Sequence, residues 1–339
     1  MPRKFFDLRF EDRREALELA GSRSGRPVAL LEKDAWVVWT LEHLFNRPDA
    51  HFLVFKGGTS LSKAHHAIAR FSEDIDVTYD IRALLGEGVE SGMPPSRSQA
   101  DKWTDAVRDK LPIWIGSSVI PRLEAALKTA RLNDVSVEYD KESVSLGYRP
   151  VAEIAYVKPV VKIEFGARST GEPAVHLQVV CDAEDHLTAE GIAFPRTTAR
   201  VMAAERTFWE KATAMHVFCI LGKFRGGDRF ARHWYDVAKL DEAGYVDKAI
   251  AEPSVGEYVA MHKTYFFREP GVDYHAAVSG SLQIVPKSDA AMLLERDYKL
   301  MVESGMFTAV EPEPFDSVIR RCATVEAKTN KARTLVAPG

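Results

Sequence analysis

Cysteine is scarce in this chain of 339 residues. Only three cysteines are present, Cys181, Cys219 and Cys322, an odd number with wide spacing. This pattern argues against a disulfide framework and against a zinc site built from cysteine pairs. It is typical of a protein that works in a reducing cytosol.

Long apolar runs are missing as well. No stretch approaches the roughly 20 apolar residues that a membrane-spanning helix needs. The first residues, Met-Pro-Arg-Lys-Phe-Phe-Asp, are charged and lack the apolar segment of a signal peptide. We therefore expect a cytoplasmic protein with no membrane partner.

The chain also lacks a strong excess of charge of one sign, since its formal net charge is −4. The net charge therefore does not indicate a nucleic-acid partner, and any contact with RNA has to be made by a local patch of positive charge. Beyond about residue 245 the sequence shows no repeat and no motif. Its length allows two domains, or one large domain with a substantial core.

A glycine-rich block followed by two acidic residues carries the chemistry. Residues 51–55 are short, apolar and aromatic and predict a buried strand, which Gly57-Gly58 then interrupts. Asp74 and Asp76 follow on a second apolar element, and residues two apart on a strand point to the same face. Neighbouring carboxylates favour a divalent cation, and backbone N–H groups at a glycine turn can hold phosphate. The combination predicts a nucleotide site, although Gly-Gly alone is usually a turn and Asp-x-Asp alone usually a solvated edge.

This block resembles the signature of a known enzyme family. Lys56-Gly-Gly-Thr-Ser-Leu-Ser-Lys63, then Arg70-Phe-Ser-Glu-Asp-Ile-Asp76, is similar to the motif of the AbiEii/AbiGii (MenT-like) nucleotidyltransferase toxins, in the DNA polymerase β-type nucleotidyltransferase superfamily. The resemblance extends over most of residues 30–240. It implies an α/β fold, with a polymerase-β-type core of a small mixed sheet and flanking helices, plus a helical C-terminal domain. We place the α/β domain at residues 1–198 and the helical domain, which would complete the active-site cleft, at residues 199–339.

The resemblance also implies roles for the residues of the block. Asp74 and Asp76 would be catalytic and would hold the metal ion, Mg²⁺ or Mn²⁺. The nucleotide would be bound by Lys56, Gly57, Gly58, Thr59, Ser60 and Lys63. In this set, residues 57–60 would cradle the β- and γ-phosphates.

A third carboxylate is expected on a neighbouring strand. Residues 157–165 alternate so that Lys162 and Glu164 share the face opposite to the apolar side chains. In the superfamily such a carboxylate completes the metal site and acts as general base, and Glu164 is the candidate by position. Many relatives carry Asp there, and glutamate is about one methylene longer. The alternative, a strand residue paired with Lys162, stays open.

A helical motif supplies a lysine. Residues 201–216 are rich in Ala, Met and Glu and predict a helix with an apolar face. Within it, Arg206-Thr-Phe-Trp-Glu-Lys211 fits the family's second motif, whose lysine contacts the nucleotide triphosphate. Lys211 would then stabilise the transition state as a point charge. The alternative is a solvated helix lysine.

A later motif, Arg232-His-Trp-Tyr-Asp-Val-Ala-Lys239, resembles the family's fourth motif. In this interpretation Asp236 orients Lys211 or Arg232 rather than binding metal, and Arg232 belongs to the nucleotide-binding set. The alternative is a local ion-pair triad, because Arg232, Asp236 and Lys239 share one face of a helix.

Three other segments are read less specifically. Glu32-Lys33-Asp34 resembles a family element, but we interpret it as solvated charges in the first turn of a core helix over residues 27–45 and assign it no chemistry. The basic loop of residues 222–232 would cover phosphates, grip RNA or serve as an exposed connector. Beyond residue 245 the pattern predicts helices, with Phe267, Leu293 and Leu300 among the core residues.

Taken as a whole, the resemblance implies a nucleotidyltransferase toxin of a toxin–antitoxin or phage-defence pair, with a separately encoded antitoxin. The donor would be an NTP and the acceptor an RNA, with the tRNA 3′ end as the family's best-supported class and blocked translation as the result. Two alternatives stay open: nucleotidylation or phosphorylation of a protein hydroxyl, and a catalytically silent nucleotide- or RNA-binding module. The intact pair of Asp74 and Asp76 counts against the silent module.

Overall fold

A computed structural model describes residues 2–152, 157–222, 229–303, 307 and 311–334. The chain divides into two compact units. Unit 1 comprises residues 1–65, 71–92 and 102–201, and unit 2 comprises residues 66–70, 93–101 and 202–339. Each unit is therefore assembled from segments that are not contiguous in the sequence.

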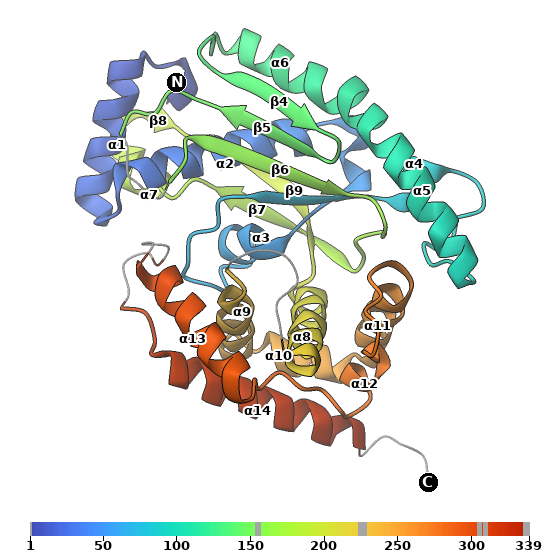
Figure 1. The fold of residues 1–339 in the computed structure, drawn as a ribbon. Coiled ribbons are helices and arrows are strands. Elements are labelled where there is room, and N and C mark those ends of the chain that lie inside the picture. The colour runs from blue at the N-terminus through green and yellow to red at the C-terminus, as the bar shows by residue number, and fades with distance from the viewer. Residues whose placement is uncertain (1, 153–156, 223–228, 304–306, 308–310, 335–339) are drawn as a thin grey trace. The chain divides into compact units, whose positions relative to one another are not determined.

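Unit 1 is built on a mixed sheet of seven strands in the order β4-β5-β6-β3-β2-β9-β7 (Figure 1). β3 runs antiparallel to β2 and parallel to β6. The buried side chains of Phe55, Val77 and Phe165 lie in register across these three strands, and this apolar row fixes the alignment. The strands of the sheet are β2 (Leu53–Lys56), β3 (Ile75–Tyr79), β4 (Ser136–Asp140), β5 (Ser143–Gly147), β6 (Val160–Gly166), β7 (Ala174–Val180) and β9 (Arg196–Met202).

The flanking helices include α2, which is buried along nearly its whole length and packs against α1, α6 and β6. A helix that is apolar on all sides belongs in a core. The helices of this part of the chain are α1 (Phe10–Ser24), α2 (Val28–Phe45), α3 (Gly57–Lys63), α4 (Ile81–Leu85), α5 (Arg97–Trp114), α6 (Ile120–Thr129) and α7 (Glu184–Leu187). A small parallel pair, β1 (Arg3–Lys4) and β8 (Ile192–Ala193), lies outside the main sheet. The predicted α/β class, with a mixed sheet and flanking helices, is confirmed.

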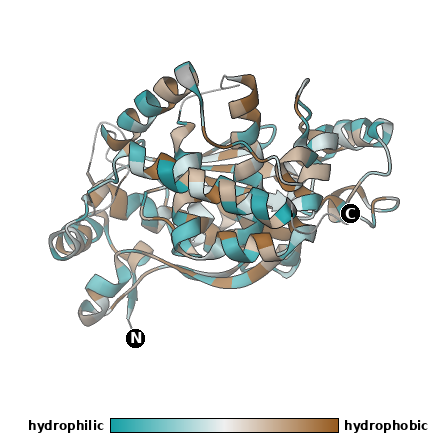
Figure 2. Ribbon diagram, turned by 90° about the horizontal axis from the view of Figure 1, so that it is seen from below, coloured by the Kyte–Doolittle hydropathy of each residue, from teal (hydrophilic) through white to brown (hydrophobic). Residues whose placement is uncertain are grey.

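Unit 2 is helical in its described part. Its helices are α8 (Ala204–Leu221), α9 (Ala231–Glu242), α10 (Tyr245–Ala251), α11 (Pro253–Phe266), α12 (Tyr274–Val278), α13 (Ser288–Glu303) and α14 (Phe315–Thr334). α9 packs against α8, α13 and α14, and α11 packs against α8 and α12. Figure 2 shows hydrophilic and hydrophobic residues combined within single helices, as expected for elements that bury one side.

Several predicted boundaries are wrong. The apolar spacing of residues 7–20 predicts a helix that Gly21 ends, but α1 continues through Gly21 to Ser24 and ends at Gly25, whose left-handed backbone (φ 72°) closes the helix. The composition of residues 86–100 predicts a surface loop, but α5 already begins at Arg97. The pattern of residues 103–131 predicts a helix broken at Pro112 and Pro121, but Pro112 lies inside α5 and the break comes as a π-helical turn over residues 115–119.

The strand β9 is absent from the sequence prediction, which assigned Val201 and Met202 to the following helix. Three predicted core residues of unit 2 are exposed instead: Phe267, Leu293 and Leu300. Helical spacing alone does not separate a core position from an exposed apolar one. No helix in the described part of the chain is long and apolar enough to cross a membrane.

Candidate functional site

The register of three central strands brings the first group of predicted residues together. Asp76 on β3 lies opposite Lys56 on β2 and opposite Glu164 on β6. Residues opposite one another on adjacent strands point to the same face of a sheet. Asp74 directly precedes β3, outside regular secondary structure, so strand alternation does not fix the direction of its side chain, although the negative charge of Asp76 acts on its carboxyl. Asp74 and Asp76 are half-buried and Glu164 is exposed. We call Asp74, Asp76 and Glu164 the acidic edge.

Electrostatics at this edge disfavour three ionised carboxylates without a cation. Burial raises the pKa of Asp74, and the negative charges of Glu73, Glu164 and Asp76 raise it further. A carboxylate that loses hydration among like charges is stabilised by any cation that approaches. The donor set therefore fits a hard divalent ion, which prefers oxygen ligands.

Glu164 satisfies both interpretations of its role. Its side chain lies in register with Asp76, as the third-carboxylate interpretation requires, and it also forms an ion pair with Lys162. The hydrogen bond to Glu164 raises the pKa of Lys162, with Asp74 and Asp76 contributing. Lys162 therefore supplies a positive charge at the acidic edge, and the general-base role of Glu164 stays a prediction.

Gly57 is placed where no side chain fits. Its φ is +80°, and a Cβ built at this position would lie 2.1 Å from Oδ2 of Asp76. The backbone at the start of α3 thus approaches the Asp76 carboxylate as closely as a glycine permits. The Asp76 carboxylate fills the place that a side chain at residue 57 would take, and Gly58 follows on the same turn.

Thr59 and Ser60 are fully buried, and their hydroxyls are engaged within the protein. The Thr59 hydroxyl donates to the main-chain carbonyl of Asp74 and lies 2.9 Å from the Ser72 hydroxyl. Ser60 donates to the carbonyl of Gly57 at 2.9 Å. These bonds fix the acidic segment to the first turn of α3. The groups that remain for a phosphate at this turn are main-chain N–H groups, which have no intrahelical partner in a first turn.

Lys63 lies in a buried ionic cluster. Its ammonium is 2.6 Å from Asp34 and 2.5 Å from Asp182. Burial lowers the pKa of Lys63, but the two carboxylates outweigh this and the net shift is upward. The structure thus gives Lys63 a role in holding α3 to α2, and its assignment to the nucleotide stays a prediction.

The interpretation of Glu32, Lys33 and Asp34 as solvated charges is wrong, because all three are at most 4% exposed. Lys33 binds Glu73, Asp34 binds Lys63, and Glu32 accepts a hydrogen bond from the main chain of Val151. The signal was present in the sequence, since three charges lie in a helix that is apolar on every side and buried charges need partners.

The second group of predicted residues lies in unit 2. Lys211 on α8 is 2.8 Å from Asp236 on α9, and Asp236 also accepts two 2.7 Å hydrogen bonds from the guanidinium of Arg70. Although burial alone would raise it, these two cations hold the pKa of Asp236 well below its usual value. Burial lowers the pKa of Lys211. Arg70 belongs to the sequence motif that ends at Asp76, but the sequence alone predicts no role for it.

The alternative for the α9 motif, a local triad of Arg232, Asp236 and Lys239, is wrong. Asp236 turns to Arg70 and Lys211, and Lys239 pairs with Glu242 at 2.9 Å and Glu313 at 3.3 Å. Arg232 is half-buried on α9 and its assignment stays a prediction. Residues 223–228 of the basic loop lie outside the described residues.

Metal binding by protein groups alone is not supported: within the described ranges, no three or more His, Cys, Asp or Glu side chains are grouped so as to hold an ion. Mg²⁺ commonly takes one or two carboxylates and completes its shell with phosphates and water.

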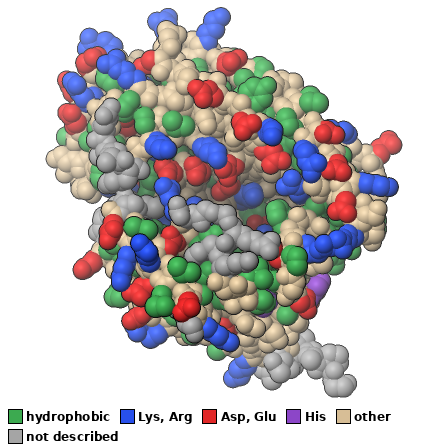
Figure 3. Space-filling view, in the orientation of Figure 1, with side chains coloured by type: hydrophobic (Ala, Val, Ile, Leu, Met, Phe, Trp, Pro, Cys, Tyr) green, Lys and Arg blue, Asp and Glu red, His purple; other side chains and the backbone are tan. Residues whose placement is uncertain are grey.

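Figure 3 shows acidic and basic side chains interspersed over the face it presents, which agrees with the small net charge.

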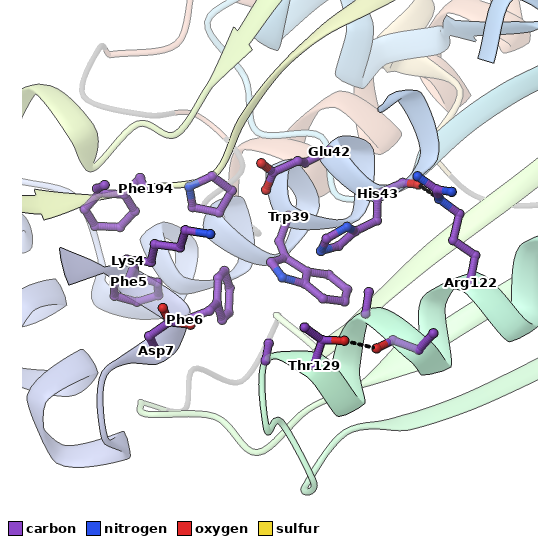
Figure 4. A pocket seen from close by; sticks show the side chains of 15 residues that line it. Lys4, Phe5, Phe6, Asp7, Trp39, Glu42, His43, Arg122, Thr129 and Phe194 are labelled. Carbon is purple, nitrogen blue, oxygen red and sulfur yellow. Dashed lines mark hydrogen bonds between the residues drawn. The ribbon is translucent and has the colours of Figure 1, made fainter. Parts of the chain in front are cut away.

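A cavity of about 450 Å³ in unit 1 contains none of the predicted site residues. Its walls include the aromatic rings of Phe5, Phe6, Trp39 and Phe194, and in Figure 4 the labelled side chains surround one space. Phe5 and Phe194 stack at 4.7 Å between centroids, so the rings already pack on one another. We assign this cavity no part in the chemistry of the acidic edge.

Comparison with known proteins identifies the family. A protein-family model described as "Nucleotidyl transferase AbiEii toxin, Type IV TA system" matches residues 39–321. The chain belongs to this family. As an AbiEii family member it is a nucleotidyltransferase, and the family description associates it with a toxin–antitoxin system, which implies an NTP substrate and an antitoxin partner. No curated protein matches the chain.

The AbiEii match includes every predicted site residue from Lys56 to Asp236. It begins at residue 39 and so leaves out α1 and most of α2, including Lys33 and Asp34. Two residues that hold the site segments in place thus precede the part that the family model recognises.

Proposed function

We propose that this AbiEii family member is a divalent-metal-dependent toxin that transfers NMP from an NTP to the 3′ end of an RNA, most specifically tRNA, and thereby blocks translation. The proposal that the protein binds a metal ion and a nucleotide is supported by the position of Asp76. This residue lies in register with Glu164 and in contact range of Gly57. The choice of tRNA rests on the resemblance of the motifs to the family signature.

Asp74 and Asp76 would hold Mg²⁺ or Mn²⁺, and the main chain of residues 57–60 would face the β- and γ-phosphates. Such an ion supplies charge neutralisation at the triphosphate and polarisation of the α-phosphate. Lys211, held by Asp236, would contribute a positive charge to the triphosphate, because its ammonium has three N–H donors and the ion pair with Asp236 does not require all of them. Arg232 and Lys56 are proposed as further contacts with the nucleotide.

The reaction would then proceed by direct displacement. Glu164, as general base, accepts the proton of the acceptor hydroxyl. At the same time, the oxygen of that hydroxyl forms a bond to the α-phosphorus. The bond from the α-phosphorus to the bridging oxygen breaks, and pyrophosphate leaves with that electron pair. Positioning and electrostatic stabilisation supply most of the rate enhancement in such transfers.

The test uses purified protein with total tRNA, Mg²⁺ and each α-³²P-labelled NTP in turn, with γ-labelled NTP in parallel. We expect α-label on tRNA with at least one NTP and no γ-label. Asp76→Asn and Lys211→Met should each reduce labelling at least 100-fold, by the loss of transition-state charge stabilisation. Asp140→Asn, which changes an exposed acid on β4 of the same sheet, should retain activity.

The outcomes separate the alternatives. Label on protein with α-NTP would favour nucleotidylation of a protein hydroxyl, and label on protein with γ-NTP would favour phosphorylation. Absence of label on any acceptor, with retained nucleotide binding, would make the protein a silent binding module.

A further inference from the structure

Lys33 is a buried cation whose ammonium is directed at the segment that carries the candidate metal ligands. It lies on α2 with 2% of its surface exposed. Its Nζ is 2.7 Å from Oε2 of Glu73 and donates to the carbonyl of Lys158 at 3.0 Å. All of these groups belong to unit 1. A buried ammonium is tolerated only where it is paired and hydrogen-bonded, so this contact is a fixed feature of the core.

The partner of Lys33 directly precedes Asp74. Residues 71–74 have no regular secondary structure, so no ladder of main-chain hydrogen bonds fixes them until β3 begins at Ile75. Side chains from two helices hold the segment instead: Thr59 of α3 bonds the Asp74 carbonyl, and Lys33 of α2 binds the Glu73 carboxylate. One anchor therefore acts on the main chain of Asp74 and the other on the residue before it.

We propose that Lys33 is a positioning residue for nucleotidyl transfer, which holds Glu73 so that the Asp74 carboxylate stays beside Asp76 and can bind the metal ion. The inference rests on the proposed function. Lys33 touches neither nucleotide nor acceptor in this role and acts on the position of Asp74 through Glu73. The role differs from a purely structural one because losing Lys33 should weaken metal binding in protein that remains folded.

The primary readout is Mn²⁺ binding, measured by the loss of the free-ion electron paramagnetic resonance signal during titration of the full-length protein. We expect Lys33→Met and Glu73→Gln each to weaken Mn²⁺ binding by about tenfold, as is typical when a group that orients a metal ligand is lost. The double variant should bind Mn²⁺ no more weakly than Lys33→Met, because both substitutions break one contact. In the labelling assay, the metal concentration for half-maximal rate should rise in parallel.

The matched control is Arg13→Met. Arg13 is another buried cation of unit 1, on α1, and it lies over the rings of Phe6 and Phe10 rather than on the acidic edge. Its loss should lower thermal stability while leaving Mn²⁺ binding unchanged.

The experiment separates failure of the positioning role of Lys33 from failure of the proposed function. If the wild-type protein neither binds Mn²⁺ nor labels an acceptor, the proposed function fails. If the wild type does both and Lys33→Met binds Mn²⁺ normally, or Arg13→Met is equally impaired, the positioning role is wrong. Should Lys33→Met not fold, Glu73→Gln alone decides, since unchanged Mn²⁺ binding in that variant would overturn the proposal.

Discussion

At the scale of single residues, the main chain of Gly57 lies so close to the Asp76 carboxylate that a side chain cannot fit there. Gly57→Ala should remove nucleotidyl transfer, because the new Cβ would displace the Asp76 carboxylate, and should also cost about 1–2 kcal/mol for an Ala with positive φ. Gly25→Ala is the matched control, since Gly25 has φ +72° but nothing lies within 4 Å of its Cβ. Urea denaturation and α-³²P labelling check both variants. Equal activity in the two would show that the contact with Asp76 is irrelevant.

Glu32 gives the protein a stability that depends on pH. Burial raises the pKa of Glu32 to about 7, although the Val151 N–H and Arg13 oppose the shift. Between the ordinary value of 4.5 and about 7, the folded state binds more protons than the unfolded state. The free energy of unfolding therefore falls as pH rises through this window.

Glu32→Gln should remove this contribution, because glutamine keeps an oxygen for the Val151 N–H and carries no charge. We expect the variant to match the wild type near pH 4.5 and to exceed it at pH 8 by on the order of 2 kcal/mol. Denaturant titrations at a series of pH values give the difference directly. A difference that does not change with pH would contradict the assignment.

At the scale of elements, α8 and α11 approach so closely that one glycine determines their packing. A Cβ at Gly256 of α11 would lie 2.8 Å from the ring of Trp209 on α8, and that ring is fully buried. Trp209 is held further by a 3.2 Å hydrogen bond from its indole N–H to the carbonyl of Ala249. The ring therefore has little freedom to move aside.

Gly256→Ala should lower the free energy of unfolding by about 1–3 kcal/mol, because overpacking outweighs the better helix propensity of alanine. Gly116→Ala is the comparison, since its Cβ would meet only Tyr139 at 3.7 Å, an ordinary contact. That variant should be neutral or stabilised. Urea titrations of both test the argument, and equal effects would refute it.

At the scale of the whole molecule, the metal ion is expected to serve chemistry and not folding. The three cysteines are unpaired thiols, and the described residues hold no cluster of metal-ligating side chains large enough for a structural site. Hydrophobic cores such as the row of Phe55, Val77 and Phe165 stabilise the fold without a metal ion.

Chelation of divalent ions should therefore stop nucleotidyl transfer while shifting the thermal midpoint by only ~1 °C, because an ion present near its dissociation constant adds only about 0.4 kcal/mol to the stability of the folded state. Thermal scans by circular dichroism, with and without EDTA, provide the measurement, and added Mg²⁺ should restore labelling. A fall of several degrees on chelation would indicate a structural metal instead.

Local patterns in the sequence determined a large part of this protein. Alternation along a strand is a local property, so the pattern located Asp76 on β3, although Asp74 lies just before that strand begins. Helix-forming composition identified α8, and apolar runs located β3, β6 and the interior of α2. Residue identity within the motifs was enough to predict the family that the comparison then confirmed.

Only the tertiary structure decided which distant charges meet. The register of β3 with β6 places Glu164 beside Asp76, and no local rule fixes the pairing of strands that are separated by 80 residues of chain, from 80 to 159. Lys33 meets Glu73, and Arg70 meets Asp236, because the packing of the core brings them together and buried charges need partners. Composition limits how many charges the interior can hold, whereas packing determines their partners.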